Sequence, residues 1–450
     1  MENRTQVPRF HLAVTLFILA ISLVYSIQNL ISPNLLTVSN YFGFGGDKSQ
    51  LAVMSFAAML TSGITMVFFG YLSDKLVRVR ILFVGTVIFS IASILVFTVG
   101  PGVNGFFLFF TLQTIAGVGL GAVIPSTFSL TGDFVSEKDR SKGFSYFSIA
   151  TLIGTVLGTL LGVIFIDIDW RISYACIGIA GSACAAMTLL LKEPSRIGRD
   201  YIYLAGKEGR EYSYRIRRSD LKVIFKKKTN IWLIVNFVDT IPTGIILFLL
   251  FAYLRQEHNV PESMAIIFLA FVIIGTLLGT FVFGFVADNS YKKGNKKARV
   301  RMALFANIAP IPFVFFGLMV PFWLPDGGSI GDLLMIPGAV LMITLVSLGL
   351  FLNGGTNGSW YATVVDINLP EHRGTVLASA NFFDILGKAI GPLLGGILAD
   401  NFGNMVGINI SIIFWCALPL FWIGVLKNVI PDMEATENLF KERIENLKKS

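Results

Sequence analysis

The sequence contains few charged residues: Asp, Glu, Lys and Arg together make up 14% of its 450 residues. Apolar residues make up 54%, and the mean hydropathy is +0.71. A water-soluble protein of this length could not bury so much apolar surface. The scarcity of charge therefore excludes an ordinary soluble fold. It favours a chain that lies largely in a bilayer, whose hydrocarbon core takes about 20 apolar residues to cross.

Cysteine is equally scarce. Cys176, Cys184 and Cys416 lie inside apolar segments and show no CxxC spacing, so the sequence offers neither a disulfide framework nor a cysteine metal site. The three histidines are scattered along the chain, and no acid–base–nucleophile cluster or nucleotide-binding P-loop is present. We therefore expect a protein that is not an enzyme, with no catalytic residue, metal or cofactor and no ATP-driven step.

Apolar segments of spanning length recur along the whole chain. They predict an all-α membrane protein of the major facilitator fold, with twelve transmembrane helices in two pseudo-symmetric six-helix bundles. The predicted spans are residues 11–33, 50–72, 80–99, 105–132, 142–166, 171–191, 231–254, 263–287, 301–323, 332–364, 374–399 and 405–427.

The positions of the basic residues predict the orientation. If both termini are cytoplasmic, nearly all of the 36 Lys and Arg residues fall on cytoplasmic segments. Short loops rich in these residues stay inside the cell. We therefore expect a monomeric multi-pass protein of the cell membrane. The net charge of +8 then reflects topology and attraction to anionic lipids of the inner leaflet, so nucleic-acid binding is not expected.

A basic, polar stretch divides the apolar segments six and six. The predicted organisation is an N-terminal bundle (1–192), a cytoplasmic linker (193–229), a C-terminal bundle (230–428) and a cytoplasmic tail (429–450). Apolar residues of the tail fall on one helical face among mixed charges, which predicts a short amphipathic helix.

Two charged motifs occur once in each half. Gly70–Asp74 recurs as Gly284–Asp288, each time at the end of the second span of its half. The second motif is an acid followed seven residues later by Arg, between the fourth and fifth spans: Asp133 and Arg140, then Asp366 and Arg373. Two motifs at equivalent places indicate a duplicated bundle.

The loop after the second span resembles the signature loop of the major facilitator superfamily. Gly70, Leu72, Ser73, Asp74, Lys75 and Arg78 match that signature, whereas Val77 replaces its glycine and Val79 replaces a base. The resemblance implies a transporter that works by alternating access. We expect the cytoplasmic charges to form a gate, although retention of topology alone is the alternative. The predicted gating residues are Gly70, Asp74, Lys75, Arg78, Asp133, Arg140, Asp288, Asp366 and Arg373.

Two longer stretches, Asp133–Gly143 and Asn357–Asp400, are similar in order and spacing to the Spinster family of lipid and organic-anion transporters. This resemblance implies an amphipathic or anionic solute such as a lysolipid. The family carries charges in the first and fourth spans that are linked to proton coupling and substrate binding. The matching positions here are uncharged: Gln28, Asn29, Gln113 and Leu120. Transport is then either facilitative or coupled elsewhere.

Ionisable residues inside spans are costly and are candidates for function. Asp239 lies in the seventh span, and Asp384 and Lys388 lie four residues apart on one face of the eleventh. Lys388 would bind an anionic head group and Asp239 would be a protonatable coupling group; a neutral pair that fixes packing is the alternative. Among neutral groups, Gln28, Asn29, Gln113 and Asn353 could hydrogen-bond a solute or neighbouring helices.

The sequence thus predicts a secondary active or facilitative transporter of a small-molecule or lipid-like solute. A transporter of sugars, organic acids or drugs remains an alternative. So does a non-transporting sensor or scaffold on the same fold, with the linker and the tail as its binding surfaces.

Overall fold

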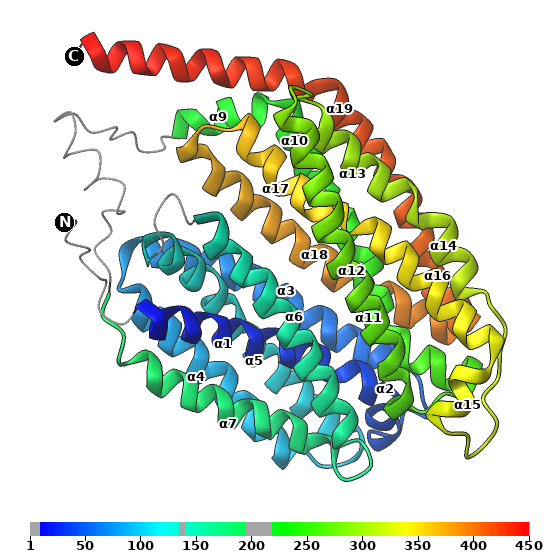
Figure 1. The fold of residues 1–450 in the computed structure, drawn as a ribbon. Helices are drawn as coiled ribbons and strands as arrows, with labels where there is room; N and C mark the ends of the chain where they lie inside the picture. Colours follow the sequence, from blue (N-terminus) through cyan, green and yellow to red (C-terminus); the bar gives the residue numbers. More distant parts are fainter. Residues whose placement is uncertain (1–9, 135–139, 194–217, 450) are drawn as a thin grey trace. The chain divides into compact units, whose positions relative to one another are not determined.

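The computed structural model describes residues 10–134, 140–193 and 218–449, and within these ranges all regular structure is helical (Figure 1). The chain forms two compact units, Met1–Glu211 and Tyr212–Ser450. The division falls inside the stretch that we predicted as a linker. The end of that stretch is not a loop, because Arg218–Lys226 forms helix α9.

The first unit contains six consecutive helical segments. They are α1 (Phe10–Asn29) with α2 (Ile31–Tyr41), α3 (Ser49–Lys75), α4 (Arg78–Leu95) with the 3₁₀ turn η1 (Val96–Thr98), α5 (Gly102–Phe134), α6 (Arg140–Ile164) and α7 (Trp170–Thr188).

The second unit also contains six segments after α9. They are α10 (Lys228–Val235) with the 3₁₀ turn η3 (Asn236–Asp239) and α11 (Thr240–His258), α12 (Glu262–Lys292), α13 (Ala298–Ile308) with α14 (Pro310–Leu318), α16 (Pro337–Asn353) with α17 (Gly355–Ile367), α18 (Pro370–Phe402) and α19 (Asn404–Lys449). The short helix α15 (Ile330–Met335) lies in the connection before α16.

The helices have the length and composition of membrane spans. Among the described residues, ten helical stretches are long and apolar enough to cross a bilayer, and α6 adds a shorter apolar stretch, Ile149–Ile164. Large apolar side chains also face outward: Phe281 and Phe285 of α12 are each 74% exposed. Such exposure is favourable in lipid and costly in water. The predicted all-α, multi-span fold class is confirmed.

The first span of each unit is broken, which the sequence analysis did not predict. In the first unit the break lies at Leu30, four residues after Ser26 and three before Pro33. In the second unit the span unwinds into η3 just before Pro242. Proline lacks the N–H that an α-helix needs and its ring clashes with the preceding turn, so both breaks have the same cause. Both breaks also place polar residues inside a span.

Glycine lets the helices of each unit approach closely. In the second unit, a Cβ on Gly391 of α18 would lie 2.6 Å from the carbonyl oxygen of Ile241 in α11. In the first unit, α1 and α6 are joined by the hydroxyl of Ser26, which donates to the carbonyl oxygen of Gly154 at 3.1 Å. Only small residues permit such approaches. The backbones of α11 and α18 are therefore held against each other.

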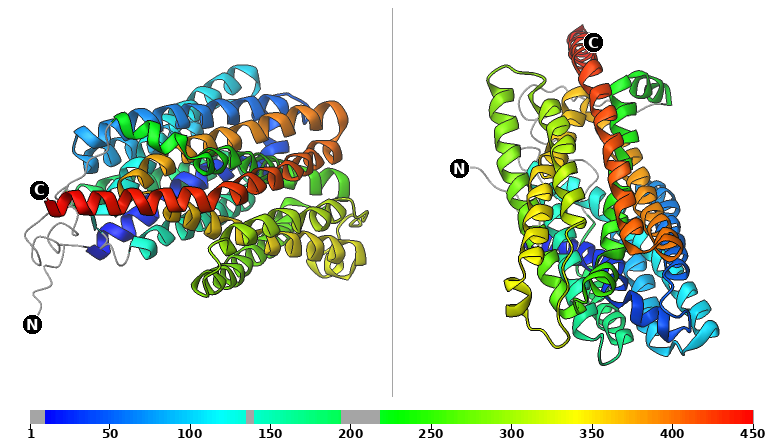
Figure 2. Two further views of the ribbon diagram at one scale, coloured as in Figure 1. Left: turned by 90° about the horizontal axis from the view of Figure 1, so that it is seen from above. Right: turned by 90° about the vertical axis from the view of Figure 1, so that its right-hand side faces the viewer.

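The C-terminal tail differs from the prediction. Instead of forming a separate short helix, residues 429–449 continue the last span, and α19 extends past the other helices of its unit (Figure 2). The reason is that its first turns are packed and hydrogen-bonded. Thr436 donates to the carbonyl oxygen of Ile367 at 2.7 Å, and Lys227 donates to both of these groups at 2.7 Å.

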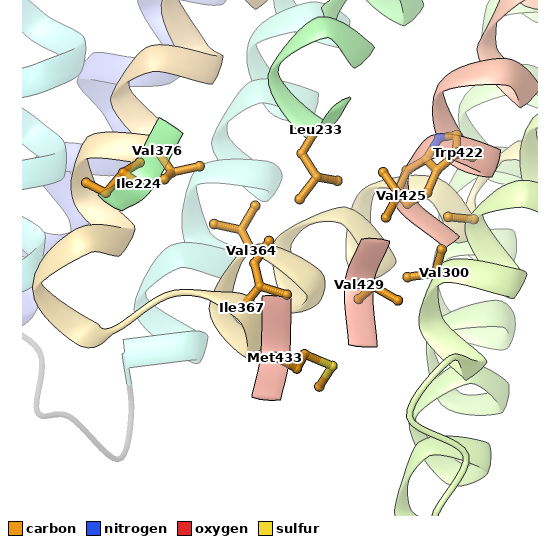
Figure 3. Close-up of a cluster of buried hydrophobic side chains, with 11 residues drawn as sticks. Ile224, Leu233, Val300, Val364, Ile367, Val376, Trp422, Val425, Val429 and Met433 are labelled. Carbon is orange, nitrogen blue, oxygen red and sulfur yellow. The ribbon is translucent and has the colours of Figure 1, made fainter. Parts of the chain in front are cut away.

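An apolar cluster lies where the tail begins (Figure 3). Trp422, Val425, Val429 and Met433 of α19 pack there against buried side chains of α9, α10, α13, α17 and α18. Because the tail contributes to this core, its first part belongs to the fold of the second unit.

Candidate functional site

A small cavity lies inside the first unit. Its volume is about 40 Å³, and its walls come from α1, α2, α3, α5 and α7. Water needs roughly 10–15 Å³ of such space, so the cavity has room for a few waters or a small polar group. Its lining residues are Ile27, Gln28, Ile31, Met54, Ser55, Ala58, Met59, Gln113, Ala116, Leu120 and Tyr174.

Three of the four predicted positions in the first and fourth spans line this cavity: Gln28, Gln113 and Leu120. The side chain of Gln113 is 93% buried, and its Nε2 has no hydrogen-bond partner among the described residues. A buried amide donor without a partner is costly. The cavity therefore offers an unused donor to an acceptor atom of a small molecule or of water. Sequence reasoning missed Tyr174 and Ser55, which lie on other helices.

The two remaining amides are used within the protein. Asn29 donates to the carbonyl oxygen of Tyr25 at 2.8 Å, one turn earlier in α1. Asn353, at the end of α16, donates to the carbonyl oxygen of Ala306 in α13 at 3.2 Å. The second bond joins two helices. Neither residue is brought to the cavity.

In the second unit, η3 places polar side chains inside the span Lys228–His258. Asp239 ends this turn, and Asn236 begins it and donates from Nδ2 to Asp239 Oδ2 at 3.3 Å. The hydroxyl of Thr240 donates to the carbonyl oxygen of Asp384 in α18 at 3.0 Å. This bond fixes α18 against the broken part of the seventh span.

The three predicted ionisable residues form one cluster. Asp239 interacts electrostatically with both Asp384 and Lys388, which lie on one face of α18, and Asp384 interacts with Lys388. All three side chains are partly exposed. Phe237 follows Asn236 in η3 and Phe383 precedes Asp384 in α18, and their ring centroids lie 5.4 Å apart. We name Asp239, Asp384 and Lys388 the ionisable cluster. The sequence indicated a neutral pair and a separate acid, whereas the structure brings all three together.

Arg78 begins the third span of the first unit and is almost fully buried. Its Nε donates to Glu193 at 2.8 Å, and its Nη1 donates to the hydroxyl of Ser129 at 3.1 Å. Glu193 also accepts the backbone N–H of Val79 at 3.0 Å. The predicted gating residue Arg78 thus joins the start of α4 to α5 and to the segment that follows α7. Glu193, at the edge of the predicted linker, was not predicted as a partner.

Arg299 holds the equivalent place in the second unit, at the start of its third span. It donates to Asp366 at 2.6 Å and to Asp288 at 2.7 Å, and its guanidinium lies 4.1 Å from the ring centroid of Tyr291. Arg373 instead donates to the backbone carbonyl oxygens of Asn368 and Val365. The sequence analysis missed Arg299, although its position repeats that of Arg78.

For most of the other predicted gating residues, the structure describes the backbone but not the side chain. The backbones of Gly70, Asp74 and Lys75 lie in the last turns of α3, that of Asp133 lies near the end of α5, and Arg140 begins α6. The side chains of Asp74, Lys75, Asp133 and Arg140 lie outside the described part of the structure.

Comparison with known proteins identifies the class. The family model of the Major Facilitator Superfamily matches residues 16–331. The "Multidrug resistance protein 2" of Bacillus subtilis (strain 168) is 22% identical over 398 residues, which cover 86% of this chain and 89% of that protein. Because the family model covers more than half of the sequence, the chain belongs to the Major Facilitator Superfamily. It is a secondary transporter and not an enzyme.

Solved structures agree with this fold. A bacterial homologue of the human lysosomal transporter Spinster, in an inward-facing and unoccupied conformation, matches with a TM-score of 0.74 and 15% identity over 95% of this chain and 98% of its own. Its occupied inward-facing form matches with a TM-score of 0.72 and 16% identity over 93% and 97%. The predicted resemblance to the Spinster family is confirmed at the level of the fold.

Proposed function

We propose that this transporter moves an amphipathic organic solute with a charged head group across the membrane by alternating access. A lysolipid is the solute that the resemblance to the Spinster family favours. The observation that carries the proposal is the ionisable cluster, because three ionisable side chains inside spans are costly unless they serve binding or coupling. The aromatic rings of Phe237 and Phe383 beside it offer an apolar surface to the rest of the solute.

In this proposal the individual side chains have different roles. Lys388 binds the negative group of the head group, with Asp384 as its partner in the empty site. Asp239 is the coupling group that gains and loses a proton. Gln28 and Gln113, which line the cavity of the first unit, are proposed to hydrogen-bond an uncharged polar group there. Discontinuous helices are common at the binding sites of transporters, and the break at η3 next to Asp239 is in line with this role.

The cytoplasmic charges are proposed to gate access. Arg78 with Glu193 in one unit and Arg299 with Asp288 and Asp366 in the other hold the ends of helices at equivalent places. Exposed ion pairs contribute only about 0–1 kcal/mol each. Several pairs that form in one conformation and break in another are nevertheless enough to shift an equilibrium between states a few kcal/mol apart.

The coupling role is tested with Asp239→Asn in reconstituted vesicles. Uptake of a labelled lysolipid is measured across a pH series for the wild type, for Asp239→Asn and for Asp47→Asn, an exposed acid in the loop between α2 and α3. We expect the pH dependence of uptake to vanish in Asp239→Asn and to persist in Asp47→Asn. Unchanged pH dependence in a folded Asp239→Asn protein would remove Asp239 from this role.

A drug transporter is a second candidate, because the Bacillus subtilis relative is named "Multidrug resistance protein 2". The two candidates differ in what stabilises the purified protein, since a bound ligand raises the unfolding temperature by mass action. Stabilisation by planar aromatic drugs without any response to lysolipids would favour the second candidate.

Truncating the tail distinguishes a transporter from the alternative, a non-transporting scaffold. The cut must follow Leu439, because Thr436 is hydrogen-bonded to Ile367 and Lys227 and belongs to the folded unit. A transporter should keep its flux after this truncation, whereas a scaffold that works through the tail should lose its partner and show no flux before or after.

A further inference from the structure

The ionisable cluster combines two carboxyl groups with one ammonium group. Asp384 and Lys388 would be neutral together, but Asp239 adds a second carboxylate from the opposite helix. Among the described residues, Asp384 and Lys388 are the charged side chains that act on Asp239. Because two acids face one base, ionisation of all three groups would leave one net negative charge inside a membrane span, which is costly unless a proton or a bound cation compensates it.

Asn236 supplies a second, independent observation. Its side chain is 96% buried and donates from Nδ2 to Asp239, while its Oδ1 has no hydrogen-bond partner among the described residues. A buried acceptor without a donor is rare in folded proteins and calls for an explanation. Because Oδ1 belongs to the same amide whose Nδ2 contacts Asp239, an N–H donor of a ligand that inserts beside this carboxylate is a candidate partner for this oxygen.

The surroundings suit an organic cation better than a bare ion. Phe237 of η3 and Phe383, which precedes Asp384 in α18, pack against each other, and an aromatic face attracts a cation as well as an alkyl chain. The three charged side chains are partly exposed, so a ligand can reach them. Lys388 remains at the other end of the cluster as a place for a negative group.

From these observations we infer that Asp239 and Asn236 bind an ammonium group of the solute, with Asp239 supplying the charge and Asn236 Oδ1 accepting an N–H. This inference rests on the proposed function, because it names the chemistry of the solute at that same site. Two kinds of solute carry such a group: an organic cation, and a zwitterionic lysolipid whose phosphate then lies at Lys388.

The test compares amphiphiles of one chain length that differ in the head group. Binding to the full-length protein in lipid nanodiscs is measured with a primary alkylammonium, an alkyltrimethylammonium, an alkyl phosphate and an uncharged alkyl glycoside. Lysophosphatidylethanolamine forms the zwitterionic arm. We expect the primary ammonium to bind at least about tenfold more tightly than the alkyl phosphate, because the Asp239 carboxylate attracts a positive head group and repels a negative one.

Variants change the net charge of the cluster in steps. Asp239→Asn and Asp384→Asn make it neutral, and Lys388→Gln makes it more negative. Affinity for the primary ammonium should fall about tenfold or more in Asp239→Asn and should be kept or raised in Lys388→Gln. Lysophosphatidylethanolamine should weaken in both variants if the zwitterion is the natural solute. If the solute is an organic cation, this lysolipid should weaken only in Asp239→Asn.

Asn236→Leu tests the hydrogen bond separately from the charge. It should weaken the primary ammonium several-fold and leave the alkyltrimethylammonium unchanged, because the latter has no N–H to donate. Equal affinity for ammonium and phosphate amphiphiles, or an affinity for ammonium that Asp239→Asn does not change, overturns the inference while amphiphile transport stands. If no amphiphile of any charge binds, the proposed function itself is wrong.

Discussion

Replacing Arg299 by methionine removes a guanidinium that bridges two acids of the second unit. One acid, Asp366, has a side chain that is 17% exposed, and the other, Asp288, is 53% exposed. Arg299 itself is 19% exposed. The two ion pairs are nearly equal in length, at 2.6 and 2.7 Å, so their difference in strength should come from solvent exposure.

The exposures set the magnitudes. A hydrogen bond to a charged group with little solvent access contributes about 1.5–3 kcal/mol to stability. An exposed ion pair contributes about 0–1 kcal/mol, because water and salt screen it. We therefore expect a coupling energy of about 2 kcal/mol between Arg299 and Asp366, and one below about 1 kcal/mol between Arg299 and Asp288. Arg299→Met alone should destabilise the protein by about 2–4 kcal/mol.

Double-mutant cycles measure both couplings in the same protein. The set comprises Arg299→Met, Asp366→Asn, Asp288→Asn and the two double variants, each unfolded in detergent micelles at low and at high salt. The coupling to Asp288 should shrink at high salt, whereas the coupling to Asp366 should largely persist. If Arg299 couples to Asp288 as strongly as to Asp366, or to neither acid, burial does not determine the strength of these contacts and the reasoning fails.

Two further predictions concern packing and pH. Gly391→Ala should destabilise the second unit by about 1–3 kcal/mol, because the added Cβ would lie 2.6 Å from Ile241 O. Gly358→Ala, where nothing lies within 4 Å of the added Cβ, should not destabilise it; both are checked by thermal unfolding. The side-chain hydrogen bond from Arg171 lowers the pKa of Asp169 in the folded protein. Ionised Asp169 therefore stabilises the folded state fully above the ordinary carboxyl pKa of about 3.9. This stabilisation is lost as the pH falls through the lowered pKa of the folded state. Asp169→Asn should therefore lower the unfolding temperature by about 1–4 °C at neutral pH, with the difference from the wild type disappearing in strong acid; a constant difference at all pH values would contradict this origin.

A residue of the candidate site could be predicted from the sequence when its immediate sequence context is unusual. Asp239, Asp384 and Lys388 are visible because charge inside an apolar run is unusual. Asn29 and Asn353 carry the same kind of signal, but the structure gives their amides to the carbonyl oxygens of Tyr25 and Ala306. A polar residue in a span gives the same sequence pattern whether it faces a solute or a neighbouring helix.

Arg299 shows a different limit. Its sequence neighbours are other bases of the same loop, so nothing in the local pattern distinguishes it. The signal that could have found it is the internal repeat, because Arg78 and Arg299 each stand at the start of the third span of their unit. The loops before them differ in length, and this difference hides the correspondence in a simple alignment of the two motifs.

The sequence by itself determined the fold class. Hydropathy along the chain is a local property, and a bilayer requires each apolar segment to form its own backbone hydrogen bonds, so long apolar segments predict helices without knowledge of their neighbours. The repeated cytoplasmic motifs likewise indicated the superfamily. Pro33 and Pro242, which cause the two breaks, are also visible in the sequence. Whether a span breaks at a proline, however, depends on the helices that pack against it.

Only the tertiary structure decided the composition of the ionisable cluster. A pair on α18 reads as neutral, and Asp239 reads as an isolated acid in another span. The glycine-mediated approach of α11 and α18, with the bond from Thr240 to Asp384, brings the three groups into one electrostatic unit. Electrostatic interactions depend on distance in space and not on separation in sequence, and for this reason the grouping of Asp239 with Asp384 and Lys388 could not be inferred before the two helices were placed together.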